Sequence, residues 1–178
     1  MKYFEAVQIG NNYLFNKNIK NYKLDVEILA SKIINKSREH LITNQKNEFT
    51  KKELRKFKEL LKKRNKKQPI AQIIKNKEFW KKNFYIDKNV LVPRPDSEHL
   101  VEEALNLIKP EKNYSILDIG SGSGCLIISI LLDRIKSRGV ALDISKKAIK
   151  VSKINAKMQH IENRIKFIHS DIDKVYRG

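Results

Sequence analysis

Apolar side chains recur at helical spacing through the first 67 residues of the chain. Two sets show this spacing, one made of Leu24, Ile28 and Leu29 and the other of Leu54, Phe57, Leu60 and Leu61. Apolar residues three and four positions apart share one face of an α-helix, so both sets predict amphipathic helices. The run Thr50-Lys51-Lys52-Glu53 fits a capping box, which predicts that a basic helix begins there. We therefore expect a helical bundle at the start of the chain.

A different pattern fills the last part of the chain. Short apolar runs at residues 115–119, 139–143 and 165–170 read as buried strands, and helical segments follow the first two of them. Strands that alternate with helices predict a parallel sheet. The expected fold class is therefore α/β, with an N-terminal helical bundle, a linker β-hairpin and a Rossmann-like sheet.

The stretch between the bundle and the sheet predicts the hairpin. Residues 79–85 and 90–92 have strand character, and they flank the turn-prone segment 86–89. This places a helical domain at residues 1–75, a linker hairpin at 76–95 and a sheet domain at 96–178.

Two prolines after this hairpin hold the chain extended around Arg94. The Arg94 guanidinium has two readings: it pairs with a carboxylate as a structural group, or it lines the mouth of a ligand site together with Pro95. Ser97 can cap the next helix. The apolar residues that this helix would direct toward the sheet are Leu100, Val101, Ala104, Leu105 and Ile108.

The charge of the chain is unevenly distributed. The 38 Lys and Arg residues against 20 Asp and Glu residues give a net charge of +18, and the first 89 residues hold 23 of these basic groups and 9 of the acidic ones. A basic half of this kind fits an anionic partner such as RNA, but it also fits a lysine-rich surface that only keeps the protein in solution. The sequence leaves both interpretations open.

Several classes of protein are disfavoured by composition. No apolar stretch reaches the roughly 18 residues that span a bilayer, and the first residues lack a signal-peptide pattern, so we expect a cytoplasmic protein. The single cysteine, Cys125, cannot form an internal disulfide and suits core packing. We expect no metal site, because the four histidines lack the paired spacing of zinc ligands. They are His40, His99, His160 and His169.

A glycine-rich segment connects the first strand of the sheet to the following helix. It reads Asp118-Ile119-Gly120-Ser121-Gly122-Ser123-Gly124. Glycines let the backbone turn sharply and approach a ligand, and the helix after them presents free N–H groups. The spacing matches neither the dinucleotide fingerprint nor the phosphate loop. A carboxylate at Asp118 would repel a pyrophosphate but suits the ammonium and sulfonium groups of S-adenosylmethionine. The alternative is an ordinary tight turn.

Two further acids follow the next two strands. Asp143 ends the second strand, where it can accept hydrogen bonds from ribose hydroxyls, although it can equally cap the helix that begins near Ser145. Asp171 follows the third strand, and either Asp171 or Ile172 would face the adenine. Three neighbouring strands thus end in acids at what we expect to be one edge of the sheet.

Five segments together resemble a known family. They are Gln-Pro-Ile-Ala from Gln68, Glu-Phe-Trp from Glu78, Leu-Val-Pro-Arg-Pro-Asp-Ser-Glu from Leu91, Leu-Asp-Ile-Gly-Ser-Gly-Ser-Gly from Leu117 and Val-Ala-Leu-Asp-Ile-Ser from Val140. In this order they resemble the HemK/PrmC methyltransferases. The resemblance implies an enzyme that uses S-adenosylmethionine to methylate the glutamine amide in the Gly-Gly-Gln motif of peptide-chain release factors. It also implies cofactor contacts at Gly120 to Gly124, at Asp143 and near Ile172.

The chain departs from this family in one important respect. The catalytic Asn-Pro-Pro-Tyr segment of the family does not occur in the 178 residues, so we assign no catalytic residue to them. An amide nitrogen is a poor nucleophile, and in the family the asparagine side chain and a neighbouring carbonyl orient it toward the methyl group. We therefore expect these residues alone to hold at most part of the cofactor site and not to catalyse methyl transfer efficiently.

The resemblance also implies a sheet that is incomplete. The family order 3-2-1-4-5-7-6 would leave the strand at residues 115–119 as an open edge, which is a pairing hazard. Self-association, disorder after about residue 110 or a longer parent protein would each answer this, and we favour the last. Two other function classes stay open: a nucleic-acid methyltransferase that uses the basic half, and a binding module without catalysis.

Overall fold

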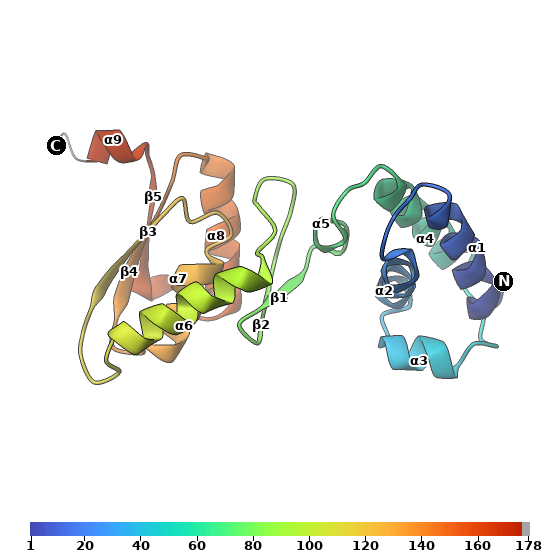
Figure 1. The fold of residues 1–178 in the computed structure, drawn as a ribbon, viewed down its shortest axis with the longest axis horizontal. Coiled ribbons are helices and arrows are strands. Elements are labelled where there is room, and N and C mark those ends of the chain that lie inside the picture. The colour runs from blue at the N-terminus through green and yellow to red at the C-terminus, as the bar shows by residue number, and fades with distance from the viewer. Residues whose placement is uncertain (176–178) are drawn as a thin grey trace. The chain divides into compact units, whose positions relative to one another are not determined.

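The structure is a computed structural model that describes residues 1–175. It divides into two compact units, Met1–Ile74 and Lys75–Gly178, which are described separately below (Figure 1). No helix in the described part of the chain is both long enough and apolar enough to cross a membrane. The described residues also contain no group of three or more acids, histidines and cysteines arranged to hold a metal ion.

The first unit is helical, as its apolar spacing predicts. Its helices are α1 (Tyr3–Phe15), α2 (Tyr22–Ile34), α3 (Arg38–Thr43), α4 (Lys51–Asn65) and α5 (Ile70–Ile74). The core includes Leu29, Phe57 and Leu61, which are buried as expected, whereas Leu24 is exposed because α2 turns it toward solvent. The apolar spacing therefore identified the two helices correctly but assigned one core residue wrongly.

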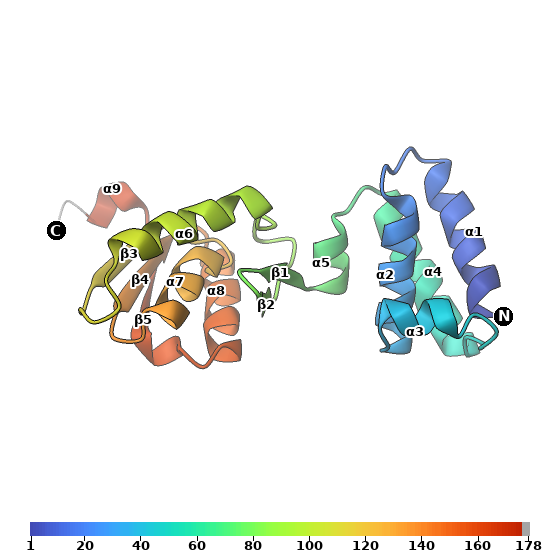
Figure 2. The same ribbon diagram turned by 60° about the horizontal axis from the view of Figure 1, so that its bottom comes forward.

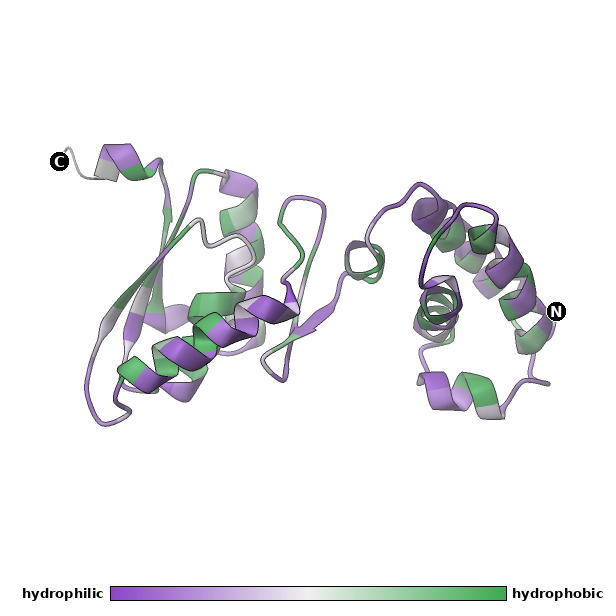
Figure 3. Cartoon of the chain, viewed as in Figure 1, coloured by the Kyte–Doolittle hydropathy of each residue, from purple (hydrophilic) through white to green (hydrophobic). Residues whose placement is uncertain are grey.

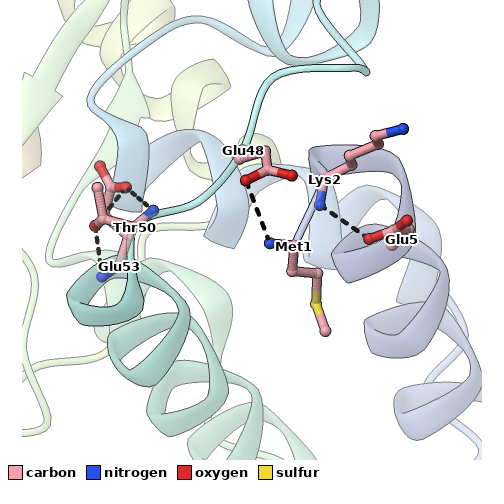
Figure 4. Close-up of polar contacts among 6 residues, drawn as sticks. All are labelled: Met1, Lys2, Glu5, Glu48, Thr50 and Glu53. Atoms are coloured by element: carbon pink, nitrogen blue, oxygen red, sulfur yellow. Dashed lines mark hydrogen bonds and ion pairs between the residues drawn. The ribbon is translucent and has the colours of Figure 1, made fainter.

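The N-terminus of α4 has the capping box that the sequence predicts. The Glu53 backbone N–H donates to Thr50 Oγ1 at 3.2 Å, and the Thr50 backbone N–H donates to Glu53 Oε2 at 2.8 Å (Figure 4). Nearby, the N-terminal ammonium of Met1 lies 3.9 Å from Glu48 Oε2 (Figure 4). The capping box satisfies the N–H groups of Thr50 and Glu53 at the start of α4 and helps to fix the loop that leads into it.

A buried ion pair joins α2 to α4. Arg64 Nε lies 2.6 Å from Asp25 Oδ2, and Arg64 also donates from Nη1 to the carbonyl of Gln68 at 3.1 Å. Both side chains are largely removed from solvent. Because an unpaired charge in this position would be costly, the pair fixes the register of the two helices.

The second unit begins with the expected hairpin, but its position differs from the prediction. The strands β1 (Lys77–Phe79) and β2 (Lys82–Phe84) pair antiparallel around Trp80 and Lys81, and residues 90–92 form no strand. Trp80 and Lys81 have φ values of +49° and +58°, as a two-residue turn requires. Segment 86–89 does turn, but through hydrogen bonds from Asn89 to the Asp87 carboxylate.

Tertiary contacts explain why the turn falls at Trp80. Its backbone N–H donates to Glu98 Oε1 at 2.9 Å, and its indole Nε1 donates to Asp133 Oδ2 at 2.7 Å. Phe79 and Phe84 on either side are fully buried and pack edge to face. These contacts compensate for a turn sequence that local preference disfavours.

The parallel sheet follows the hairpin and has the order β3-β4-β5. Its strands and the helices around it are η1 (Pro95–Ser97), α6 (Glu98–Leu107), β3 (Ser115–Ile119), α7 (Cys125–Asp133), β4 (Arg138–Asp143), α8 (Lys146–Met158), η2 (Glu162–Arg164), β5 (Ile165–His169) and α9 (Ile172–Val175). Helix α7 packs against β3 and β4, and α8 packs against β4 and β5 (Figures 1 and 2). The mixed helical and parallel-sheet fold predicted from the sequence is therefore confirmed.

Helix α6 differs in detail from the expectation. It packs against α7, with Val101 fully buried, while Leu100 is exposed rather than directed inward. Its alternating polar and apolar residues are visible in Figure 3, in contrast to the mostly apolar α7. Ser97 stands at the N-cap position, but its side chain accepts no capping hydrogen bond, because the chain enters α6 through the η1 turn.

The strand β3 lies at the edge of the described sheet. Leu117 and Ile119 point to the face opposite α7 and α8 and are 50% and 49% exposed. Ile116, on the other face, is partly buried and packs against the core that contains Ile127 and Ile165. Helices α7 and α8 thus cover one face of the sheet. On the opposite face, the edge strand β3 leaves apolar side chains exposed.

Candidate cofactor-binding site

The site is built around the loop between β3 and α7. Gly120, Gly122 and Gly124 have φ values of +73°, +55° and +77°, a left-handed conformation that favours glycine. The backbone N–H groups of Gly120 and Ser121 donate to the carbonyl of Leu142 at 2.8 and 3.0 Å. The loop is therefore attached to the end of β4 as well as to the strand that precedes it.

Two of these glycines have different physical roles. A Cβ on Gly124 would lie 2.3 Å from Ser152 Oγ, so this glycine permits close packing between the loop and α8. A Cβ on Gly120 would meet nothing within 4 Å. The loop thus has a packed side at Gly124 and an open side at Gly120, where a ligand can approach the backbone.

Asp143 connects the glycine loop to the start of α8. Its Oδ2 accepts a hydrogen bond from the Gly122 N–H at 2.9 Å, and its Oδ1 accepts one from the Ser145 N–H at 2.8 Å. Ser145 in turn caps α8, accepting from the Ala148 N–H at 3.2 Å. Asp143 therefore helps to shape both the loop and the turn before α8, and a carboxylate oxygen has lone pairs left for a further donor.

Asp118 lies on the same face of the sheet as Asp143. It pairs with Ala141 across the parallel ladder, and Asp143 follows two residues later in β4. Burial raises the pKa of the Asp118 carboxyl to about 6, the Ile127 backbone N–H opposes this shift, and the negative charge of Asp143 adds to it. Asp118 Oδ2 is buried and has no hydrogen-bond partner among the described residues.

An unpartnered buried carboxylate oxygen beside an acid is unfavourable by itself. A positively charged ligand would relieve it, because it would restore the charged form of Asp118. The Ser121 hydroxyl in the same loop is also buried without a partner among the described residues. The residues present therefore fit a ligand that carries a positive charge together with hydrogen-bonding groups.

Asp171 and Ile172 follow β5 near the same edge. The Ser170 N–H donates to the carbonyl of Asp143 at 3.2 Å, which brings the end of β5 beside the end of β4. Asp171 Oδ1 accepts from the Asp173 N–H at 3.2 Å at the start of α9. Both Asp171 and Ile172 are half-buried.

Arg94 and Pro95 are exposed in the structure. No carboxylate among the described residues pairs with the Arg94 guanidinium, so the structure does not contain the structural ion pair that was one reading of this residue. The Arg94 carbonyl accepts from the Ser97 N–H at 3.0 Å. A role for Arg94 and Pro95 at the mouth of a ligand site stays a prediction.

Asn155 is a site residue that the sequence analysis did not identify. Its Oδ1 accepts from the Tyr85 N–H at 2.6 Å, and its Nδ2 donates to the Tyr85 and Ser123 carbonyls at 3.0 and 2.9 Å. The side chain is fully buried. A polar residue on the buried face of α8, between Ser152 and Ala156, was the available signal. Asn155 therefore links the segment after the hairpin to the glycine loop.

Comparisons with known proteins agree with this architecture. The PrmC N-terminal domain matches residues 5–74, and a methyltransferase domain matches residues 110–177. The release factor glutamine methyltransferase of Clostridium acetobutylicum is 35% identical over 97% of this chain and 60% of its own length. The bifunctional methyltransferase of Rickettsia prowazekii is 36% identical over 83% of this chain and 32% of its own length.

One solved structure aligns over less than half of the chain. A SAM-dependent methyltransferase from Geobacter sulfurreducens, in complex with S-adenosyl-L-homocysteine, covers 44% of this chain and 30% of its own at 29% identity and a TM-score of 0.37. This chain spans 60% of the length of the Clostridium relative and about a third of the Rickettsia one.

The fold and the family matches define the class of protein. The chain contains a region that matches a methyltransferase domain, preceded by a helical region that matches the PrmC N-terminal domain. The resemblance to the HemK/PrmC methyltransferases is confirmed, because relatives named release factor glutamine methyltransferases match most of the chain.

Proposed function

We propose that the second unit binds S-adenosylmethionine at the glycine loop. The cofactor is the methyl donor for methylation of the glutamine amide of a peptide-chain release factor. The observation that carries the cofactor assignment is the buried, unpartnered oxygen of Asp118 beside a glycine loop that Asp143 holds open. The relatives support the choice of substrate, since release factor glutamine methyltransferases match up to 97% of the chain. Such a substrate implies a cytoplasmic protein.

In this proposal each residue has a definite task. Gly120 offers its open side to the ligand, and the buried Ser121 hydroxyl provides a donor. Asp143 accepts hydrogen bonds from ribose hydroxyls with its remaining lone pairs, and Asp118 lies below as a negative charge. Asp171 or Ile172 borders the adenine, and Arg94 and Pro95 line the entrance. The cofactor supplies a methyl group made electrophilic by its sulfonium charge.

Methyl transfer also requires the amide nitrogen to be oriented. The family uses an Asn-Pro-Pro-Tyr segment for this purpose, and it does not occur in these 178 residues. We therefore propose that these residues bind the cofactor but do not by themselves methylate a release factor at an appreciable rate.

Isothermal titration of the purified chain with S-adenosylmethionine tests the cofactor proposal. We expect saturable binding that Asp143→Ala weakens at least about tenfold, because it removes an acceptor and loosens the loop. Asp173→Ala is the matched control, since this acid is exposed and lies at the same edge of the sheet. The cofactor assignment is wrong if the folded chain releases no heat, or if both variants bind alike.

A second assay tests the substrate. Transfer of a labelled methyl group to a release factor is compared with transfer to transfer RNA, using the chain alone and the chain joined to the part of the Clostridium acetobutylicum relative that lies outside the match. We expect labelled release factor only with the joined protein. Labelled RNA would instead favour a nucleic-acid methyltransferase, and efficient transfer by the 178 residues alone would contradict the proposed division of roles.

A further inference from the structure

The helical unit has a groove that is separate from the glycine loop. It lies between α1 and α4, has a volume of about 220 Å³ and is lined by Ile9, Tyr13, Lys58, Leu61 and Lys62. Ile9 is 52% exposed and Tyr13 is 38% exposed. The floor is therefore apolar, and the lysines can lay their aliphatic stems along it while the ammonium groups stay in solvent.

The packing of the unit holds this groove open in a fixed shape. Gly10 lets α1 approach its neighbours closely, because a Cβ there would lie 2.9 Å from Val26 Cγ1 and 3.4 Å from Leu61 Cδ1. At the other end, Asn65 Nδ2 donates to the Tyr13 hydroxyl at 2.9 Å. The floor residues are thus positioned before any partner arrives, which lowers the entropic cost of binding.

A stripe of cations runs along one side of the groove. Lys51, Arg55, Lys58 and Lys62 are spaced four, three and four residues apart, so they share one face of α4, and all four are exposed. Within residues 1–175 none of them forms an ion pair. On α1, Glu5 is held at the start of the helix, where it accepts from the Lys2 N–H at 3.0 Å (Figure 4).

We propose that this groove, called here the α1–α4 groove, docks an acidic amphipathic helix of a protein partner. Apolar side chains one turn apart on that helix would cover Ile9 and Tyr13, and its carboxylates would face the cation stripe on α4. A nucleic-acid backbone fits less well, because it would bring phosphates and sugars onto an apolar floor. The combination of an apolar floor and one unpaired cationic wall is the observation that selects the partner.

This inference rests on the proposed function in one respect, since an enzyme that methylates a protein gains from holding its substrate at a second surface. Binding at the groove does not itself require methyl transfer. The two proposals can therefore fail independently, and cofactor titration of the same samples shows which one has failed.

The test uses a fluorescein-labelled helical peptide of about 16 residues, with leucines at helical spacing and glutamates along one flank. A peptide of the same composition in scrambled order is the reference. Fluorescence anisotropy with the whole chain is expected to show at least about tenfold tighter binding of the amphipathic peptide, weakening as salt rises from about 50 to about 300 mM.

Charge reversals on α4 provide the matched variants. The double change Lys58→Glu and Lys62→Glu is expected to weaken peptide binding about tenfold or more, because it replaces two attractions with two repulsions. Lys56→Glu with Lys63→Glu makes the same change in net charge on the same helix but away from the groove, and is expected to alter binding less than about threefold. Ile9→Ser tests the apolar floor and is expected to weaken binding without changing its salt dependence.

Three outcomes would overturn the proposal. The first is equal binding of the ordered and scrambled peptides. The second is equal loss in the two charge-reversed proteins, which would indicate a general attraction to positive charge. The third is a single-stranded RNA that displaces the peptide with higher affinity, which would assign the stripe to nucleic acid. Circular dichroism checks that each variant is folded. If the Lys58→Glu, Lys62→Glu protein is not folded, Lys58→Ser with Lys62→Ser is used in its place.

Discussion

Asn155 offers a sharp test of how the glycine loop is held. Replacing Asn155 with alanine removes three hydrogen bonds and leaves the Tyr85 N–H, the Tyr85 carbonyl and the Ser123 carbonyl without this partner. An orphaned buried polar group costs about 1–3 kcal/mol, and part of this is recovered by relaxation or water. We expect the free energy of unfolding of the second unit to fall by about 3–5 kcal/mol.

The single tryptophan makes this measurable for one unit. Trp80 is the only tryptophan in the chain, and its indole is bonded to Asp133 in the second unit. Urea unfolding followed by tryptophan fluorescence therefore reports on this unit and not on the helical one. Gln159→Ala is the control, because Gln159 is the C-cap residue of the same helix and donates one exposed hydrogen bond to the Asn83 carbonyl at 2.9 Å. It is expected to cost less than about 1 kcal/mol.

Asn155→Asp separates hydrogen bonding from volume. The new carboxyl keeps the shape of the side chain and can still accept from the Tyr85 N–H, but when ionised it donates to neither carbonyl. Burial next to two carbonyl oxygens raises its pKa in the folded state, so this variant loses stability as pH rises through that pKa. It should be closer to wild type at acidic pH than at alkaline pH. Equal stability of Asn155→Ala and Gln159→Ala would refute the reasoning.

Three further predictions follow from other contacts. Asp25→Ala leaves the partly buried Arg64 guanidinium unpaired and should lower the stability of the helical unit by about 2–4 kcal/mol, measured by circular dichroism. Burial raises the pKa of Asp118 from 3.8 to about 6, so the free energy of unfolding falls by at most about 3 kcal/mol as pH rises from about 4 to about 6. Asp118→Asn should remove this pH dependence of the free energy of unfolding. Lys81→Gly relieves a positive φ and should raise the stability of the second unit by about 0.5–1 kcal/mol, whereas a decrease would show that the Lys81 side chain stabilises the turn.

The alternation of strands and helices was readable from the sequence because it depends on local periodicity. The three apolar runs became β3, β4 and β5, and the capping box at Thr50 formed as written. The glycine loop was equally readable, since glycine is the residue that adopts positive φ at low cost. Such features are determined by residues that are close in the sequence.

The hairpin shows where local patterns fail. Residues 86–89 have the better turn composition, yet the two-residue turn forms at Trp80 and Lys81, because Glu98 and Asp133 bind Trp80 and the flanking phenylalanines are buried. These partners lie 18 and 53 residues away along the chain. No local propensity contains that information.

The sequence by itself determined which residue types stand at the ends of the strands, and these residue types are the basis of the ligand proposed for this edge. Only the tertiary structure decided that Asp143 binds Gly122, that one Asp118 oxygen is left without a partner, and that Asn155 joins Tyr85 to Ser123. The physical reason is that hydrogen bonding and burial depend on neighbours brought together by folding, whereas backbone preference depends on the residue itself and those beside it.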